Sequence, residues 1–167
     1  MKVIKKWLDK TLEFLTAGVM GVLVLDVLWQ VATRFILKNP SSWTEELATY
    51  LLIWVGLLGS AVALKRGAHL GIDYFVGKLM FKQRLLTEIF VFVCVIGFAL
   101  SVLVFGGLRL VTETFLLGQV SPAIGIRLGY VYLAVPIAGF FISMYALEFL
   151  FQTIKKLKSL EQTQETK

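Results

Sequence analysis

The stretch "LATYLLIWVGLLGSAVAL" (residues 47–64) decides the fold, because it contains no charged side chain. A helix of about 20 mainly apolar residues crosses the hydrocarbon core of a bilayer. The whole chain agrees with this stretch, since 57% of its residues are hydrophobic and only 17% are charged. Soluble domains carry roughly 25% charged residues. The sequence therefore predicts an integral membrane protein.

Three further apolar runs, one before this stretch and two after it, are also long enough to span a membrane. The first of them is longer than the apolar core of a signal peptide, which has about 7–15 residues, so we predict that it stays in the mature protein. The prediction is an all-α membrane fold with a single domain, residues 1–167. Its transmembrane helices are expected at about 12–37, 47–64, 85–108 and 128–151, and a polar tail at 152–167.

The basic residues predict how the helices are oriented. Lysine and arginine are enriched on the cytoplasmic side of membrane proteins. Most of the 17 basic residues of this chain lie before the first run, between the second and third runs, or after the fourth. We therefore predict that both termini are cytoplasmic and that segments 38–46 and 109–127 lie outside. The net charge of +6 is explained by this topology, so no nucleic acid is expected as a partner.

Residues 70–81, "LGIDYFVGKLMF", are too short to span a membrane. Ile72, Phe75, Val76, Leu79 and Met80 follow the spacing of one helical face. We predict a short amphipathic helix at the cytoplasmic interface, and a loop helix that packs on the bundle is an equal alternative.

Residues that could carry out catalysis are scarce. The chain has one histidine, His69, and one cysteine, Cys94, so a zinc site of histidine and cysteine ligands cannot be assembled. Glycine-rich phosphate loops and nucleophile elbows are also missing from the sequence. We predict that the chain is not an enzyme and has no cofactor.

Asp26, Gln30 and Arg34 are spaced by four residues, so they share one face of the first helix. Ionisable residues inside a membrane span usually face protein or a water-filled cavity. One interpretation makes Asp26 a site for a proton or cation. The interpretation that we favour is a polar ladder that satisfies its own hydrogen bonds and docks the helix on a neighbour.

The second helix begins beside two carboxylates. The spacing of Ser42 and Glu45 is typical of a capping box. Trp43 stands where an interfacial aromatic side chain is expected. A cap requires only one of the two glutamates, so Glu45 and Glu46 together indicate a second role.

Small residues at a spacing of four indicate close contacts between helices. The pairs are Ala17 with Gly21, Gly56 with Ser60, and Gly97 with Ser101.

Residues 30–73 carry a distinctive combination of motifs. Arg34 and Phe35 precede "WTEEL" at 43–47, then comes an apolar helix, and then an Arg-Gly-x-His-x-x-x-Asp pattern formed by Arg66, Gly67, His69 and Asp73. Together with "SPAIGIRLGYVYLAVPIAG" at 121–139, this resembles the small membrane subunit of tripartite ATP-independent periplasmic (TRAP) transporters, the DctQ-like family. The family often has other residues where this chain has Thr49, Arg127 and Tyr145.

The resemblance implies a role without catalysis in the bacterial inner membrane. In this family the small subunit is a scaffold for a large membrane subunit, which carries the sodium and substrate sites. A periplasmic substrate-binding protein delivers an organic acid such as a C4-dicarboxylate or sialic acid. The resemblance suggests that Trp43, Glu45 and Glu46 contact one of these partners, and that Arg66, Gly67, His69 and Asp73 form an interfacial turn.

A different class of function remains as an alternative. A four-helix chain with an acidic residue in mid-membrane could be a stand-alone, homodimeric exporter of small molecules. In that hypothesis Asp26 carries the coupling proton.

Overall fold

The computed structural model describes residues 2–39, 41–67 and 81–165. The predicted amphipathic helix at 70–81 lies outside these ranges, except for its last residue, and so do His69 and Asp73. The helices are α1 (Lys2–Phe35), α2 (Ser42–Lys65), α4 (Phe81–Phe98), the π-helix η1 (Ala99–Gly106), α5 (Gly107–Leu116), α6 (Leu128–Tyr132) and α7 (Ala134–Glu165).

Four helices are long and apolar enough to cross a membrane, as the sequence predicted. They cover Lys5–Phe35, Ser42–Lys65, Gln83–Leu116 and Leu128–Ser159. The third is continuous through α4, η1 and α5. Regular structure in the described ranges is helical, and an isolated bridge between Val120 and Arg127 is the one β-type pairing there. Helix α7 runs on to Glu165, through most of the segment expected as a polar tail.

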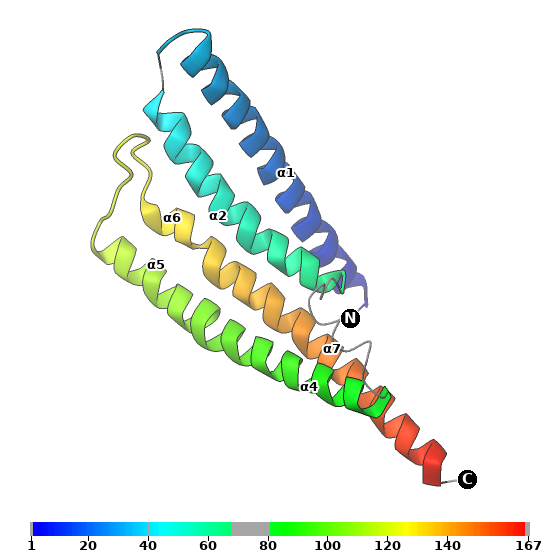
Figure 1. Cartoon of the computed structure of the whole chain (residues 1–167). Coiled ribbons are helices and arrows are strands. Elements are labelled where there is room, and N and C mark those ends of the chain that lie inside the picture. The colour runs from blue at the N-terminus through cyan, green and yellow to red at the C-terminus, as the bar shows by residue number, and fades with distance from the viewer. Residues whose placement is uncertain (1, 40, 68–80, 166–167) are drawn as a thin grey trace.

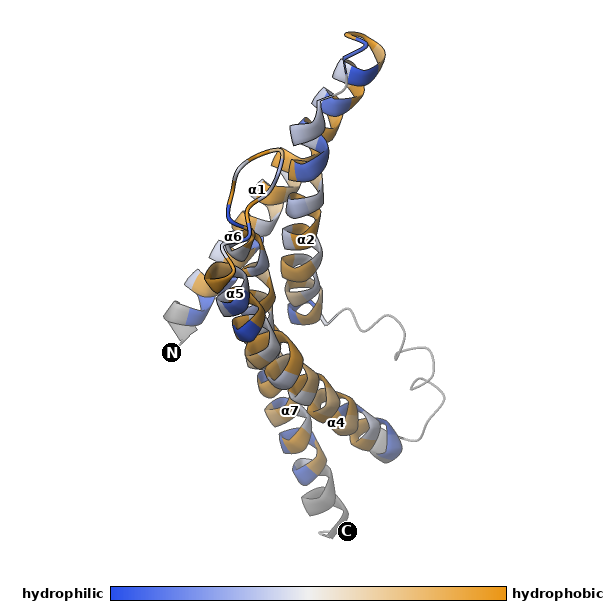
Figure 2. Ribbon diagram, turned by 90° about the vertical axis from the view of Figure 1, so that its left-hand side faces the viewer, coloured by the Kyte–Doolittle hydropathy of each residue, from blue (hydrophilic) through white to orange (hydrophobic). Residues whose placement is uncertain are grey.

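The four spans lie side by side in a row (Figure 1). Along this row α1 packs on α2, α2 packs on α7, and α7 packs on α4 and η1. The central position of α7 shows in its burial. In the most apolar 18-residue stretch of its span, 39% of the residues are buried, against 6% in that of α1. Both termini lie at the same end of the helices, and the connections α1–α2 and α5–α6 lie at the opposite end of the helices. Orange, hydrophobic colouring predominates along α4 and α7, with blue, hydrophilic residues toward the ends (Figure 2).

Three glycines let the helices approach one another closely beside α7. A Cβ atom on Gly139 would lie 2.6 Å from the Cβ of Leu103 in η1, and a Cβ on Gly107 would lie 3.0 Å from the Cδ of Pro136. Gly129 of α6 approaches the ring of Phe115 in the same way. The contact between α5, η1 and α7 therefore depends on the lack of side chains at these glycines.

The predicted small-residue pairs do not form these contacts. A Cβ atom added at Gly21, Gly56 or Gly97 would meet nothing within 4 Å. These glycines are open toward the described part of the chain, so their spacing does not mark close contacts between the described helices.

Candidate functional site

The first turn of α2 is held by a hydroxyl pair. Ser41 is the N-cap residue and makes no side-chain bond to the helix backbone. Its Oγ lies 2.7 Å from Thr44 Oγ1, and Thr44 Oγ1 also donates to the Ser41 carbonyl oxygen at 2.8 Å. The predicted capping box of Ser42 and Glu45 is therefore wrong, because the helix starts at Ser42 and the cap lies one residue earlier.

Glu46 connects α2 to the segment between α5 and α6. Its Oε1 accepts a hydrogen bond from the Tyr50 hydroxyl at 2.7 Å. Its Oε2 accepts one from the Ser121 hydroxyl at 2.6 Å and one from the Ala123 backbone N–H at 2.9 Å. We call Glu46, Tyr50, Ser121 and Ala123 the Glu46 cluster. It joins residues that lie far apart in the sequence, and both carboxylate oxygens are used within the chain.

The segment that Glu46 holds, residues 117–127, is itself compact. The Ser121 N–H donates to the Ile126 carbonyl at 2.8 Å, and the Leu128 N–H donates to the Gln119 carbonyl at 3.0 Å. Gly125 turns the chain with a φ of 76°, a conformation that glycine adopts without steric cost. We call residues 117–127 the α5–α6 loop.

Trp43 and Glu45 differ from Glu46 in their surroundings. Both are exposed, Trp43 to 46%. A groove of about 530 Å³ lies between the start of α2 and the α5–α6 loop, and its lining includes Glu45, Thr49 and Pro122. The three residues predicted to contact a partner therefore divide into two outward-facing side chains and one that anchors the loop.

Sequence reasoning did not identify Tyr50 and Ser121 as parts of this site. Tyr50 lies one helical turn after Glu46, so the spacing of four was an available signal. No spacing rule connects Glu46 to Ser121. The fold buries Ser121, which is only 2% exposed.

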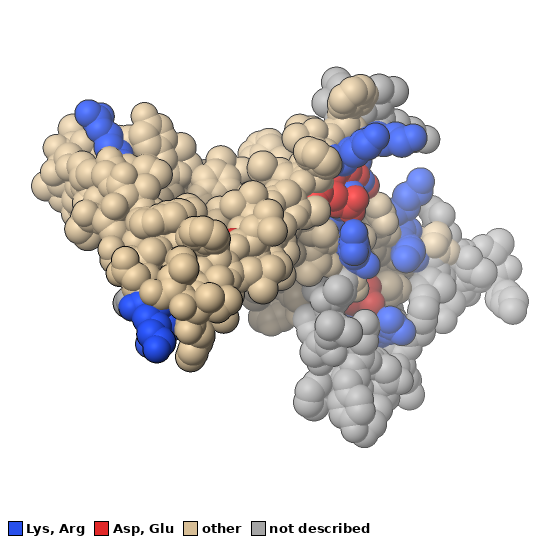
Figure 3. Space-filling model, turned by 90° about the horizontal axis from the view of Figure 1, so that it is seen from above, with Lys and Arg blue, Asp and Glu red and all other residues tan. Residues whose placement is uncertain are grey.

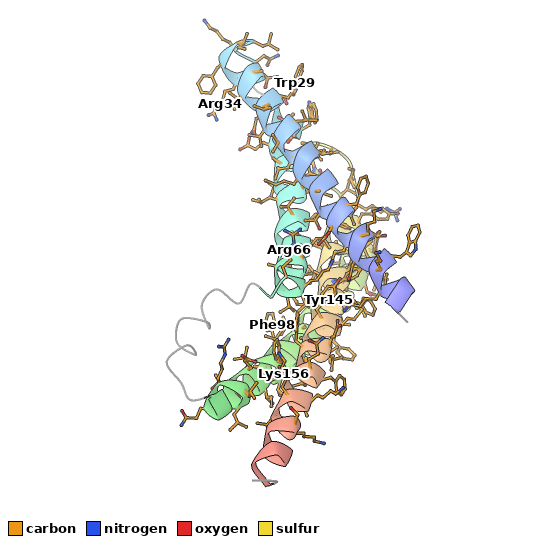
Figure 4. All side chains as sticks on the ribbon, turned by 90° about the vertical axis from the view of Figure 1, so that its right-hand side faces the viewer. Trp29, Arg34, Arg66, Phe98, Tyr145 and Lys156 are labelled. Carbon is orange, nitrogen blue, oxygen red and sulfur yellow. The ribbon has the colours of Figure 1, made fainter. Side chains whose placement is uncertain are left out.

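The structure places Asp26 and Gln30 on the side of α1 that faces α2. Most of the buried and half-buried residues in this part of α1 recur at 12, 16, 19, 23, 26, 30 and 33, and α1 packs on α2. Asp26 is only 7% exposed, and its Oδ2 has no hydrogen-bond partner among the described residues. Arg34 is exposed at the other end of α1 from the Arg66 and Tyr145 region (Figure 4).

Polar side chains also join three helices at the end that carries the termini. Asp9 of α1 accepts a hydrogen bond from the Tyr145 hydroxyl of α7 at 2.7 Å. Its other oxygen lies 3.6 Å from Lys65 Nζ of α2. Tyr145 is only 1% exposed, so this bond lies inside the helix contact.

Further ion pairs extend this network. Glu13 Oε1 lies 3.2 Å from Lys65 Nζ and 3.5 Å from Arg66 Nη2. Lys5 pairs with Glu148 of α7. Of the predicted interfacial turn, Arg66 closes α2 and Gly67 follows it with a φ of 69°, while the other two residues lie outside the described ranges.

Charged side chains are concentrated near the two ends of the helices. On the face shown in Figure 3, Lys and Arg gather with Asp and Glu at one end, and a broad uncharged surface separates them from the basic residues at the other end. Within the described ranges, no group of three or more His, Cys, Asp or Glu side chains could hold a metal ion.

Comparison with known proteins gives one consistent family. Residues 23–156 match the family described as "Tripartite ATP-independent periplasmic transporters, DctQ component". The sialic acid TRAP transporter small permease protein SiaQ of Vibrio cholerae is 30% identical over 94% of this chain and 89% of its own length.

Two longer relatives contain a segment similar to this chain. The sialic acid TRAP transporter permease protein SiaT of Haemophilus influenzae is 35% identical over 59% of this chain, but over only 16% of its own length. The isethionate TRAP transporter permease protein DctMQ of Oleidesulfovibrio alaskensis is 29% identical over 79% of this chain and 22% of its own length.

Proposed function

This chain belongs to the DctQ family and is the small permease subunit of a TRAP transporter with a large permease partner, and we propose that it is the scaffold on which the large subunit moves its substrate. Proteins named as transporter permease subunits are not enzymes, which agrees with the prediction from the sequence. We further propose that residues 1–167 act as one membrane domain in the bacterial inner membrane, with both termini in the cytoplasm.

The observation that carries the scaffold proposal is the open row of helices. In a closed four-helix bundle every helix packs along two neighbours, but here α1 lies at the edge of the row and α2 is its main neighbour. In a bilayer, apolar exposure alone does not indicate a partner, because lipid tails solvate apolar side chains. A docking face for a partner helix must therefore have features that bind protein more strongly than lipid.

Helix α2 has such a face. Beyond its first turn, its exposed residues recur at helical spacing, and the set is Thr49, Leu52, Gly56, Ser60 and Ala63. Four of these five are small or hydroxyl-bearing, and nothing in the described part of the chain lies within 4 Å of a Cβ placed on Gly56. Small faces let two helix backbones come close, which is the main source of helix association in lipid. We propose that a helix of the large subunit packs on this face.

The transported compound is proposed to be an organic acid. The relatives named above are sialic acid and isethionate transporters, and both compounds are organic acids. The C4-dicarboxylate class stays open beside sialic acid. We propose that uptake is coupled to sodium and that a periplasmic binding protein delivers the substrate.

The exposed pair Trp43 and Glu45 and the adjoining α5–α6 loop are proposed as the docking surface for that binding protein. This surface lies at the helix ends opposite the termini. The Glu46 cluster joins its two parts, the start of α2 and the α5–α6 loop. The alternative of a stand-alone exporter is abandoned, because the family and its relatives are transporter components.

Co-purification tests the scaffold proposal. Gly56→Leu combined with Ser60→Leu would fill the small face of α2, and we expect the yield of the large subunit recovered with the tagged chain to fall at least fivefold. Gly97→Leu is the matched control, because Gly97 is equally open but lies on α4. Unchanged recovery with the α2 double variant would reject this docking face.

A further inference from the structure

One polar face of α7 lies just beyond the apolar part of that helix. Gln152, Lys155, Lys156 and Ser159 are spaced at i, i+3, i+4 and i+7, so they share one side of the helix. They line a groove of about 350 Å³. These four side chains are exposed, whereas the nearby Thr153 faces the rest of the protein and is buried. This part of α7 projects beyond the other helices (Figure 1), and Figure 4 labels Lys156 on it.

Among the described residues, no acidic side chain neutralises the lysines of this groove. The acidic residues at this end whose side chains are described all have basic partners, namely Asp9, Glu13, Glu88 and Glu148. Among the described acids, Glu148 accepts a hydrogen bond from Gln152 of the groove at 3.4 Å, and it is paired with Lys5. Lys155 and Lys156 have no ion pair among the described residues. Two positive charges therefore face outward with no counter-charge from the described side chains.

An exposed apolar row leads along α7 to these lysines. Phe140, Leu147 and Phe151 are exposed to 57%, 39% and 69%. Phe151 lies one helical turn before Lys155, which is about 6 Å along the helix axis. The same side of α7 thus presents apolar side chains and, one turn after the last of them, ammonium groups.

From this arrangement we infer that the α7 groove binds the phosphate of an anionic phospholipid. Lys155 and Lys156 would pair with the phosphate, Gln152 would donate a hydrogen bond to it, and one acyl chain would lie along Phe151 and Leu147. Basic residues immediately beyond a membrane helix attract anionic lipid headgroups. A lipid satisfies both halves of the surface, whereas a free phosphate ion would leave the apolar row without a partner.

Native mass spectrometry of the intact complex with its large subunit tests this inference. Phosphatidylglycerol is titrated into the detergent-purified complex, with phosphatidylethanolamine as the zwitterionic comparison that has no net charge. Each lysine at an anionic surface contributes roughly a fivefold gain in affinity. We therefore expect Lys155→Gln combined with Lys156→Gln to weaken the tightest phosphatidylglycerol binding by about 25-fold.

Two controls separate the site from general charge effects. Lys6→Gln with Lys10→Gln removes the same charge from exposed positions on α1 at the same end, and should change the affinity less than twofold. Lys155→Arg with Lys156→Arg keeps the charge and should keep the affinity. Three results would each overturn the inference: equal loss in the α1 control, equal binding of phosphatidylethanolamine, or no loss in the glutamine variant. Displacement of the lipid by millimolar inorganic phosphate would show a simple anion site instead.

Discussion

Replacing Tyr145 with phenylalanine would remove one interhelical hydrogen bond and leave the shape of the buried ring unchanged. The hydroxyl donates to Asp9 Oδ1 at 2.7 Å, and the side chain is only 1% exposed. Hydrogen bonds between membrane helices contribute about 0.6 kcal/mol on average and at most about 1.7 kcal/mol. A charged acceptor strengthens the bond. We therefore expect Tyr145→Phe to lower the free energy of unfolding by about 1.5 kcal/mol.

The assay is reversible unfolding of the full chain in mixed micelles, followed by helical circular dichroism. A double-mutant cycle with Asp9→Ala isolates the pair, and we expect a coupling energy of about 1 kcal/mol. Tyr130→Phe is the matched control, since Tyr130 is 56% exposed and keeps its ring contact with Phe115 as phenylalanine. A coupling energy near zero would refute the argument that this bond holds α1 to α7.

Three other substitutions test other parts of the structure. Glu46→Gln should reduce uptake by the assembled transporter without reducing membrane insertion, because the α5–α6 loop loses its charged acceptor. Glu45→Gln should leave that loop in place. Uptake into proteoliposomes is measured for both variants. Gly139→Leu should abolish stable folding, because its Cβ would lie 2.6 Å from Leu103, and size-exclusion profiles in detergent would show this. Leu58→Ala removes a fully buried side chain and should cost about 2 kcal/mol, the low end for such cavities, because lipid supplies no hydrophobic transfer gain.

Features that depend on the composition of a local segment were predictable from the sequence. The four spans follow from apolar runs that lack charge, since a charged side chain inside lipid is costly over the whole length of a helix. The shared side of Asp26 and Gln30 follows from helical periodicity. The N-cap was misplaced by one residue, because Ser41 and Ser42 are both suitable caps and the choice depends on where Thr44 is buried.

Features that depend on which helices meet were not predictable. The small residues at Gly21, Gly56 and Gly97 have the expected spacing but are open, whereas Gly107 and Gly139 form the close contacts. Spacing shows that a helix has a small face, but it does not show which neighbour, if any, that face meets.

The sequence alone thus determined that this chain is a four-span membrane protein, and its motifs indicated the family, because hydrophobicity and short motifs are local properties. The tertiary structure decided the roles of individual polar side chains. Glu46 meets Ser121, and Asp9 meets Tyr145, across large separations in the chain. Those pairings exist only because α7 packs beside α2 and its polar ends come into register with α1, which no local pattern specifies.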